Sequence, residues 1–254
     1  MHKRIESIQN LKVKEWKKLH TKKGRMAQQK FFIEGMHLVE EAFKYKSRIE
    51  VLLIVEGTDI PTDWLREIEE INYVTPDVMK HLSQIETSQG VAAICSVHTP
   101  SFQLEKGCSY LLIDQVQDPG NFGTLIRTAE AIGAKAVLYT KGTVDLYNDK
   151  VIRATQGAVF HFPILEVDGL ETIHACREKG IPVYGSALQN AVDYREVSPT
   201  QEFLLIVGNE GSGVNKNLLN ETTKNIYLPI FGESESLNVA VAAGILLYYL
   251  KNEE

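Results

Sequence analysis

Residues 228–239 read Leu-Pro-Ile-Phe-Gly-Glu-Ser-Glu-Ser-Leu-Asn-Val, and they join an expected strand to a long apolar helix. Pro229 and Gly232 are typical of a turn, and Ser236 can cap the helix that Leu237 begins. Asn238 falls in the first helical turn, where free N–H groups and side-chain amides can meet a ligand. Small residues at 240 and 242–244 favour close helix packing, either within the chain or between subunits. This stretch therefore predicts the last strand–helix pair of an α/β fold.

Similar elements alternate from residue 109 onward. Buried apolar runs predict strands, and periodic or capped segments predict helices. The strands are expected at 110–114, 136–139, 182–185, 203–207 and 225–228, the helices at 122–132, 149–155, 171–179 and 237–251, and a short extended piece at 159–164. This order indicates a mostly parallel sheet with helices on both faces, in which ligands bind beyond the carboxyl ends of the strands.

Two further loops follow expected strands. In the first, Pro119-Gly120 turns the chain, Asn121 is a favoured helix N-cap, and Arg127 lies about two turns into the helix. Taken by itself, that segment is better explained by a capped helix with a surface arginine. In the second, residues 208–213 hold three glycines and one acid, which suits a ligand approaching the backbone but also a plain turn. The spacing matches neither a P-loop nor the dinucleotide fingerprint of a nicotinamide dehydrogenase.

The N-terminal part has a different charge. Residues 1–30 hold ten Lys or Arg against two Glu, a net of +8, so the other 224 residues carry −14. A basic arm on an acidic body is typical of a protein that binds a polyanion, although a solvated helix face would show the same charges. Helices are expected at 4–20, 37–45, 61–71 and 76–85, a basic loop at 21–30, and strands at 31–33, 50–55, 73–74 and 91–97. We therefore expect a basic arm and small α/β domain at 1–97, a linker at 98–108, and a larger domain at 109–254.

The bulk composition indicates a globular protein of a reducing compartment. Three cysteines lie far apart without a C-x-x-C pair, so no disulfide framework and no metal site are expected, and a cytoplasmic location is favoured. The start of the chain lacks the apolar block of a signal peptide. The apolar run at 237–250 is shorter than the roughly 20 residues that a membrane span needs, so no membrane partner is expected.

Together, the three loops resemble the motifs of the SpoU/TrmH family of RNA ribose 2′-O-methyltransferases, in the SPOUT superfamily. The first motif, P-x-N-x-G-x-x-x-R-x-A, is matched by Pro119, Asn121, Gly123, Arg127 and Ala129. The second, G-x-E-x-x-G, is matched by Gly208, Glu210 and Gly213. The third, P-x-x-G-x-x-x-S-L-N-V-S, is matched by Pro229, Gly232 and residues 236–239, with Ala240 in place of the last serine. Residues 31–42 are also similar to the small RNA-binding domain that many members carry.

The resemblance implies a trefoil knot in the C-terminal α/β domain, a small N-terminal substrate-binding domain, a homodimer, and S-adenosylmethionine as cofactor. It implies an RNA partner, with ribosomal RNA favoured over transfer RNA. The implied cofactor-binding residues are Gly185, Val207, Gly208, Asn209, Leu228, Ile230, Ser236, Leu237, Asn238 and Val239. The expected RNA contacts are the basic residues Lys22, Lys23, Arg25 and Lys30.

The implied reaction also suggests roles for Arg127, Asn121 and Glu210. A ribose hydroxyl is a weak acid, so the reaction needs a group that takes its proton or stabilises growing negative charge. Arg127 is the candidate, as a cation that orients the hydroxyl, because the pKa of arginine exceeds about 12. Asn121 would hold the guanidinium or the ribose, and Glu210 would anchor Asn121, Arg127 or the cofactor. An RNA-binding protein that has lost catalysis remains the alternative, and binding of S-adenosylmethionine would distinguish the two.

Overall fold

The computed structural model of the chain describes residues 2–98 and 100–251. It divides into two compact units. The N-terminal unit takes in the chain up to residue 98 together with residues 145–161, and the C-terminal unit takes in 99–144 and the chain from 162 onward. The chain thus passes between the units three times. Residues 145–161, expected within the larger domain, pack with the N-terminal unit. In the described part of the chain, no helix is long and apolar enough to cross a membrane.

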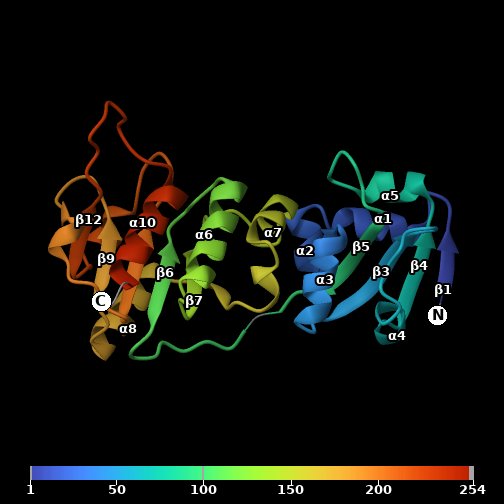
Figure 1. Cartoon of the computed structure of the whole chain (residues 1–254), viewed down its shortest axis with the longest axis horizontal. Helices are drawn as coiled ribbons and strands as arrows, with labels where there is room; N and C mark the ends of the chain where they lie inside the picture. The colour runs from blue at the N-terminus through green and yellow to red at the C-terminus, as the bar shows by residue number, and fades with distance from the viewer. Residues whose placement is uncertain (1, 99, 252–254) are drawn as a thin grey trace. The chain divides into compact units, whose positions relative to one another are not determined.

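The C-terminal unit is built on a parallel sheet of seven strands (Figure 1). In sheet order they are β10 (Val192–Asp193), β12 (Lys224–Tyr227), β9 (Val183–Ser186), β11 (Phe203–Val207), β6 (Ser109–Ile113), β7 (Ala136–Thr140) and β8 (Ile164–Val167). Each neighbouring pair is parallel. The central strands β6 and β11 are buried along their whole length, which explains the apolar sequence of β11 and of β6 after Ser109. The expected parallel sheet is confirmed, whereas the short edge strand β10 gave no recognisable signal.

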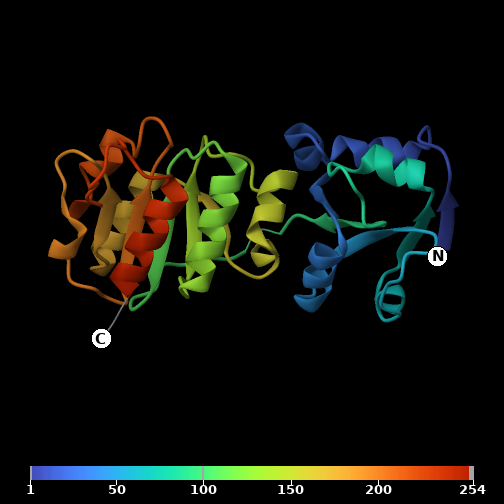
Figure 2. The same ribbon diagram turned by 45° about the horizontal axis from the view of Figure 1, so that its top comes forward.

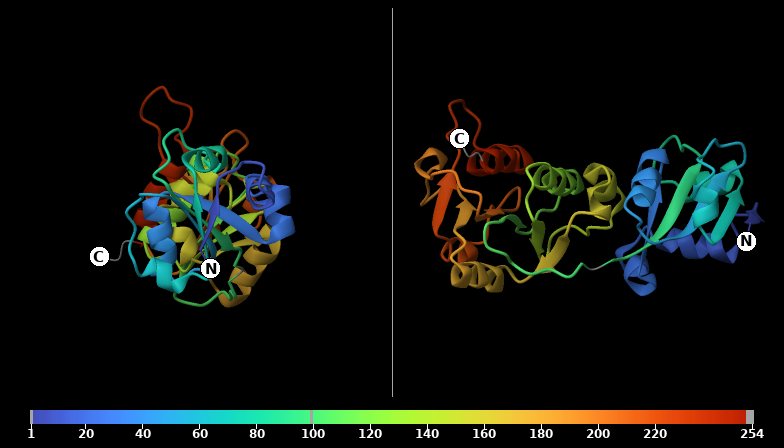
Figure 3. Two further views of the ribbon diagram at one scale, coloured as in Figure 1. Left: turned by 90° about the vertical axis from the view of Figure 1, so that its right-hand side faces the viewer. Right: turned by 60° about the horizontal axis from the view of Figure 1, so that its bottom comes forward.

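Helices cover both faces of this sheet. α6 (Pro119–Ala131) and α10 (Val239–Lys251) pack against each other on one face, and α8 (Gly169–Lys179) lies on the other (Figure 2 and the right panel of Figure 3). α8 also contacts the short helix α9 (Lys216–Leu219), and a 3₁₀ turn (Tyr194–Glu196) follows β10. The loop between β12 and α10 projects from the unit (Figure 1).

The N-terminal unit has a mixed sheet of five strands. In order they are β1 (His2–Ile5), β4 (Glu70–Val74), β3 (Ile49–Val55), β5 (Val91–Ser96) and β2 (Lys30–Glu34). α1 (Leu11–Lys18) and α5 (Pro76–Leu82) supply one apolar cluster, and α3 (Met36–Lys44), α4 (Trp64–Glu67) and α7 (Asp149–Thr155) supply another. Phe32 belongs to the first cluster and Phe31 to the second, as the two-residue period of a strand requires.

Several expectations for the helices and strands were wrong. Residues 2–5 form β1 rather than the start of a helix, and only 64–67 of the expected 61–71 helix is helical. The extended piece expected at 159–164 begins as a 3₁₀ turn (Ala158–Phe160), and β8 starts only at Ile164. The basic loop at 21–30 is mostly helix α2 (Lys22–Gln28), which Thr21 caps by accepting a hydrogen bond from the Gly24 amide. A Cβ on Gly24 would lie 2.0 Å from the Lys18 carbonyl oxygen, so the glycine permits a tight α1–α2 turn.

Candidate active site at the carboxyl edge of the parallel sheet

Four adjacent strands bring the three motif loops to one edge of the sheet. Val207, at the end of β11, pairs with Ile113 at the end of β6. On the other side of β11, Ile206 pairs with Gly185 of β9, which in turn pairs with Asn225 of β12. Since the strands are parallel, the segments that follow them start from the same edge. The expected gathering of these loops is therefore present.

Glu210 organises the contact between the first two loops. Its Oε2 accepts a hydrogen bond from the Gln117 amide at 3.1 Å. Its Oε1 accepts bonds from the Asp118 amide at 3.1 Å and from Asn121 Nδ2 at 3.0 Å. Of the three roles considered for Glu210, the structure shows the anchoring of Asn121.

These donors also set the charge of Glu210. Partial burial raises the pKa of this carboxyl group, but the bonds from Asn121 and from backbone amides, including those of Gln117 and Asp118, lower it further than burial raises it. The pKa therefore lies below its ordinary value of 4.5. Glu210 is a carboxylate at neutral pH, and it can only accept hydrogen bonds.

Hydrogen bonds link the side chains of Glu210, Asn121 and Asn238 into a relay that extends from Glu210 to α10. Because the carboxylate only accepts, Asn121 must turn its amide nitrogen toward Glu210 and its Oδ1 away from it. That Oδ1 accepts a bond from Asn238 Nδ2 at 2.9 Å. Asn238 Oδ1 in turn accepts from the Ala240 amide at 2.9 Å and the Val241 amide at 3.3 Å. Each member of the relay comes from a different motif loop.

The helix caps differ from the expected ones. Asp118, not Asn121, caps α6 by accepting a bond from the Asn121 amide at 2.8 Å. Asn238, not Ser236, caps α10, which begins at Val239. The acidic cap leaves the Asn121 side chain available for the relay.

The glycine-rich loop after β11 closes on itself. The Asn209 and Gly213 backbones exchange hydrogen bonds of 3.1 and 2.9 Å. Asn209 Oδ1 accepts bonds from the Gly211 and Ser212 amides, and its Nδ2 donates to the Gln115 carbonyl at 2.9 Å. A Cβ on Gly208 would lie 2.1 Å from the Val214 nitrogen, so only glycine allows this closure.

Asp114 was missed by the sequence reasoning. It is 3% exposed and follows β6 directly. Its Oδ1 accepts a bond from Thr140 Oγ1 at 2.8 Å, and its Oδ2 accepts one from the Asn215 amide at 2.8 Å. A buried carboxylate must be paired, so Asp114 ties the ends of β6 and β7 to the glycine-rich loop. The signal for this role was an acid that ends an otherwise apolar strand.

Apart from Gly185, the remaining expected cofactor residues lie in the segment that follows β12 and leads into α10. Leu228, Ile230 and Val239 are half-buried, while Ser236 and Leu237 are exposed. Gly185 has a packing explanation, because a Cβ there would lie 2.5 Å from Asn225 Oδ1 and 2.6 Å from Leu219 Cδ2. Apolar groups beside backbone amides and an ionised acid suit an adenosine that carries a sulfonium and an ammonium group. The donor set therefore fits S-adenosylmethionine.

Arg127 is exposed on α6. It lies six positions after Asn121, which is about 9 Å along a helix axis. Within residues 2–98 and 100–251, no hydrogen bond or ion pair holds its guanidinium, so Asn121 does not grip Arg127 in this chain. The guanidinium is free to meet a group from another molecule.

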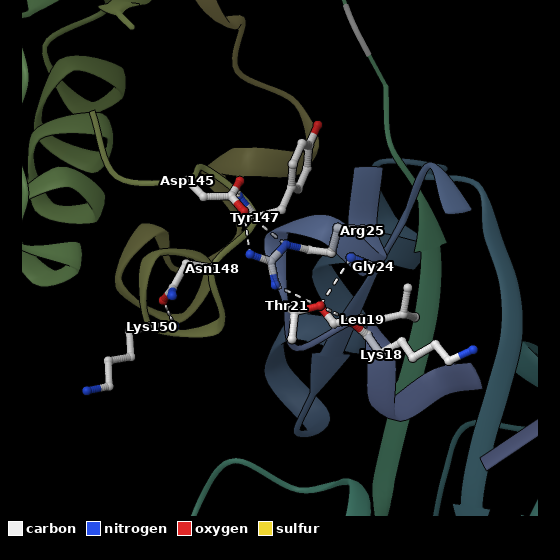
Figure 4. Close-up of polar contacts among 9 residues, drawn as sticks. All are labelled: Lys18, Leu19, Thr21, Gly24, Arg25, Asp145, Tyr147, Asn148 and Lys150. Atoms are coloured by element: carbon white, nitrogen blue, oxygen red, sulfur yellow. Dashed lines mark hydrogen bonds and ion pairs between the residues drawn. The ribbon is translucent and has the colours of Figure 1, made fainter. Parts of the chain in front are cut away.

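The expected RNA contacts on the N-terminal unit have different surroundings. Lys22 and Lys23 are exposed, whereas Lys30 pairs with Glu50. Arg25 is 6% exposed, and its guanidinium points at Asp145 (Figure 4). This corrects the expectation for Arg25, because a buried and paired guanidinium is not available to phosphate.

The fold and the site are those of an α/β protein with a ligand site at the carboxyl edge of its sheet, and comparisons with known proteins identify the class as methyltransferases that act on RNA. The SpoU rRNA Methylase family model matches residues 109–248, and an MRM3-like substrate binding domain matches residues 10–93. The 23S rRNA (guanosine(2553)-2′-O)-methyltransferase RlmP of Bacillus subtilis is 46% identical over 98% of this chain and 99% of its own length.

Solved structures give the same result. An rRNA methyltransferase from Sinorhizobium meliloti with bound AdoMet superposes with a TM-score of 0.89 at 30% identity, covering 98% of this chain and 97% of that one. An RNA 2′-O ribose methyltransferase superposes with a TM-score of 0.84 at 29% identity, covering 97% of both chains. The chain belongs to the SpoU rRNA methylase family.

Proposed function

We propose that this chain transfers the methyl group of S-adenosylmethionine to a ribose 2′-hydroxyl of ribosomal RNA. The relay of Glu210, Asn121 and Asn238 is the observation that carries the proposal, since it joins all three motif loops into one site. Arg127 lies on the same helix as Asn121 and has no partner among the described residues. Family membership and the kinship to rRNA 2′-O-methyltransferases support the same reaction.

The cofactor would lie against the loops that follow β9, β11 and β12. Leu228, Ile230 and Val239 would contact its apolar surface, and the backbone from Val207 to Asn209 would meet its polar groups. When bound, S-adenosylmethionine supplies an activated methyl group whose sulfur leaves as a neutral thioether. Glu210 would not touch the methyl group, because its oxygens already accept three N–H bonds and hold the loops in place.

Arg127 would act on the ribose. Its cation would orient the 2′-hydroxyl and lower the pKa of that hydroxyl as the oxygen–carbon bond forms, while arginine itself keeps its protons. The hydroxyl proton leaves to solvent or to an RNA phosphate oxygen. Asn121 and Asn238 would keep the helix that carries Arg127 in register with the cofactor loops. A protein that only bound RNA would not need this relay.

The N-terminal unit would bind the RNA. Its likeness to a substrate binding domain supports this role, as do the exposed Lys22 and Lys23. A guanosine of 23S rRNA, as in the Bacillus subtilis relative, is the first target to examine. Such a substrate implies action in the cytoplasm, where a bacterium assembles its ribosomes.

Homodimerisation would use α10. Val241, Ile245 and Tyr248 of α10, together with Leu237 just before it, are 40–59% exposed and recur every three or four residues, which leaves an apolar stripe facing outward. A second copy of the chain is the occupant we propose for this stripe. We also propose that the chain is knotted, because β11 and β12 each insert between strands that precede them in sequence, as a threaded C-terminal segment requires.

Labelled methyl transfer tests the reaction. The parent protein and Arg127→Ala would be compared on rRNA that lacks the modification, and calorimetry would measure S-adenosylmethionine binding. We expect both proteins to bind the cofactor and only the parent to label the RNA. Equal labelling by both would refute the role of Arg127, and absence of cofactor binding by the parent would favour a protein that only binds RNA.

A further inference from the structure

Arg25 uses its guanidinium in two directions (Figure 4). Nη1 donates to the Leu19 carbonyl at 2.7 Å, which ties α2 to the end of α1. Nε donates to Asp145 Oδ2 at 3.1 Å, and Nη2 forms an ion pair with the same oxygen. The side chains of Arg25 and Asp145 are 7% and 19% exposed. A guanidinium that is buried and bonded on two sides is suited to holding protein groups in place, whereas one that binds phosphate must be accessible at the surface.

Asp145 begins the segment that packs with the N-terminal unit. Its Oδ1 accepts a bond from the Tyr147 amide at 3.1 Å. The Tyr147 ring lies 4.6 Å from the Phe31 ring, and its hydroxyl donates to the His98 carbonyl at 3.2 Å. Asn148 then caps α7. The ion pair is thus the first of several contacts that fix residues 145–155.

The residues just before Asp145 contact the loop that anchors Glu210. The Val144 amide donates to the Val116 carbonyl at 2.9 Å. Gln117 Nε2 donates to the Gly142 carbonyl, and the Gln117 amide donates to Glu210. The contacts of Asp145 lie within the N-terminal unit and those of Val144 within the C-terminal unit, and the peptide bond between these two residues is the link from Arg25 toward the loop that holds Glu210.

We propose that Arg25 is a positioning residue for methyl transfer, which acts through Asp145 on the loop at 115–118 and so on Glu210. The inference deepens the proposed function and rests on it. Arg25 would not contact RNA, although Lys22 and Lys23 on the same helix would. The pair would keep the methyl-transfer site assembled while those lysines hold the substrate.

The Asp145→Asn substitution distinguishes this positioning role from a role in RNA binding, because the two roles predict different effects of the substitution. Asparagine keeps an oxygen for the Tyr147 amide but removes the charge that holds Arg25. If Arg25 were an RNA ligand restrained by Asp145, its release would tighten RNA binding. If Arg25 positions the loop, Asp145→Asn and Arg25→Ala should both lower kcat.

The test measures kcat, RNA affinity, cofactor affinity and thermal stability in full-length parent, Arg25→Ala, Arg25→Lys, Asp145→Asn and the Arg25→Ala/Asp145→Asn double variant. Arg25→Lys keeps the positive charge but lacks the branched guanidinium, and it replaces Arg25→Ala in the comparison if Arg25→Ala fails to fold. Arg66→Ala is the matched control, since its exposed side chain pairs with the exposed Asp63 and with no other residue in the part of the chain that the structure describes. We expect each single variant to lower kcat about tenfold. The double variant should fall no further, RNA affinity should change little, and the control should match the parent.

Weaker RNA binding with unchanged kcat, or tighter RNA binding by Asp145→Asn, would overturn the proposal. Loss of thermal stability alone, with parental kcat in the folded protein, would also overturn it by showing a purely structural role. A parent that transfers no methyl group would instead refute the proposed function. Even with such an inactive parent, cofactor affinity can test the positioning role, and an affinity that is unchanged in both Arg25→Ala and Asp145→Asn would count against that role.

Discussion

Asn238 performs two tasks that a pair of substitutions can separate. Its Oδ1 caps α10, and its Nδ2 donates to Asn121 Oδ1 at 2.9 Å. Asn238→Ala removes both. Loss of an N-cap costs about 1 kcal/mol, and loss of an exposed neutral hydrogen bond costs about 0.5 kcal/mol. For a chain of this size, a total near 1.5 kcal/mol lowers Tm by roughly 3–6 °C.

Asn238→Asp retains the cap and breaks the bridge. A carboxylate still accepts from the Ala240 and Val241 amides, and its charge is favourable at a helix N-terminus. It cannot donate to Asn121, and a flipped Asn121 amide would turn its oxygen toward the Glu210 carboxylate. One of the two contacts of Asn121 must therefore be lost.

Thermal melts and calorimetry with S-adenosylmethionine distinguish the two tasks. We expect Asn238→Asp to keep a Tm close to that of the parent while its cofactor affinity falls about tenfold, the equivalent of 1.4 kcal/mol. Asn238→Ala should show the same loss of affinity together with the lower Tm. Parental affinity in Asn238→Asp would refute the claim that the relay builds the cofactor pocket.

Three further predictions concern the same unit. The pKa of Glu210 in the folded protein lies below its ordinary 4.5, so ionised Glu210 stabilises the fold above that pH, and its contribution is lost as pH falls through the folded pKa. Thermal melts over the acidic range should therefore show a pH-dependent loss of stability in the parent that is absent in Glu210→Gln, and the same dependence of Tm on pH in both proteins would contradict this prediction. Gly208→Ala places a Cβ 2.1 Å from the Val214 nitrogen, so calorimetry should show cofactor binding abolished, and parental binding would show that the loop tolerates opening. Val241→Glu puts a charge on the apolar stripe of α10, so light scattering should give the mass of one chain for the variant and of two chains for the parent, and the same mass for both would exclude this face.

The sequence predicted the C-terminal unit well because its elements depend on local signals. Phe203–Val207 is buried along its length, and an uninterrupted apolar run is what such a strand needs. The relay could not be predicted in detail, since Glu210 and Asn121 meet only when the sheet places β6 beside β11. Which asparagine caps a helix and which one bridges two loops also depends on that tertiary contact.

The N-terminal segment shows the opposite case. Lys22–Gln28 has a glycine and four polar side chains, and besides its Thr21 cap the helix is held by the contact of Arg25 with Asp145, which lies 120 positions along the chain and which no local pattern contains. The same contact explains why charge alone misassigned Arg25. Net charge identifies a polyanion-binding region, but ion pairing decides which cations in it remain free.

Mapping of 2′-O-methyl groups in ribosomal RNA tests the central claim most directly. Ribosomal RNA would be compared from cells with the gene, cells without it, and cells complemented with the parent or with Arg127→Ala, using the resistance of 2′-O-methylated linkages to alkaline hydrolysis. We predict one 23S rRNA position that is protected with the gene, exposed without it, restored by the parent and not by Arg127→Ala. Identical protection patterns in all four RNAs would contradict the account.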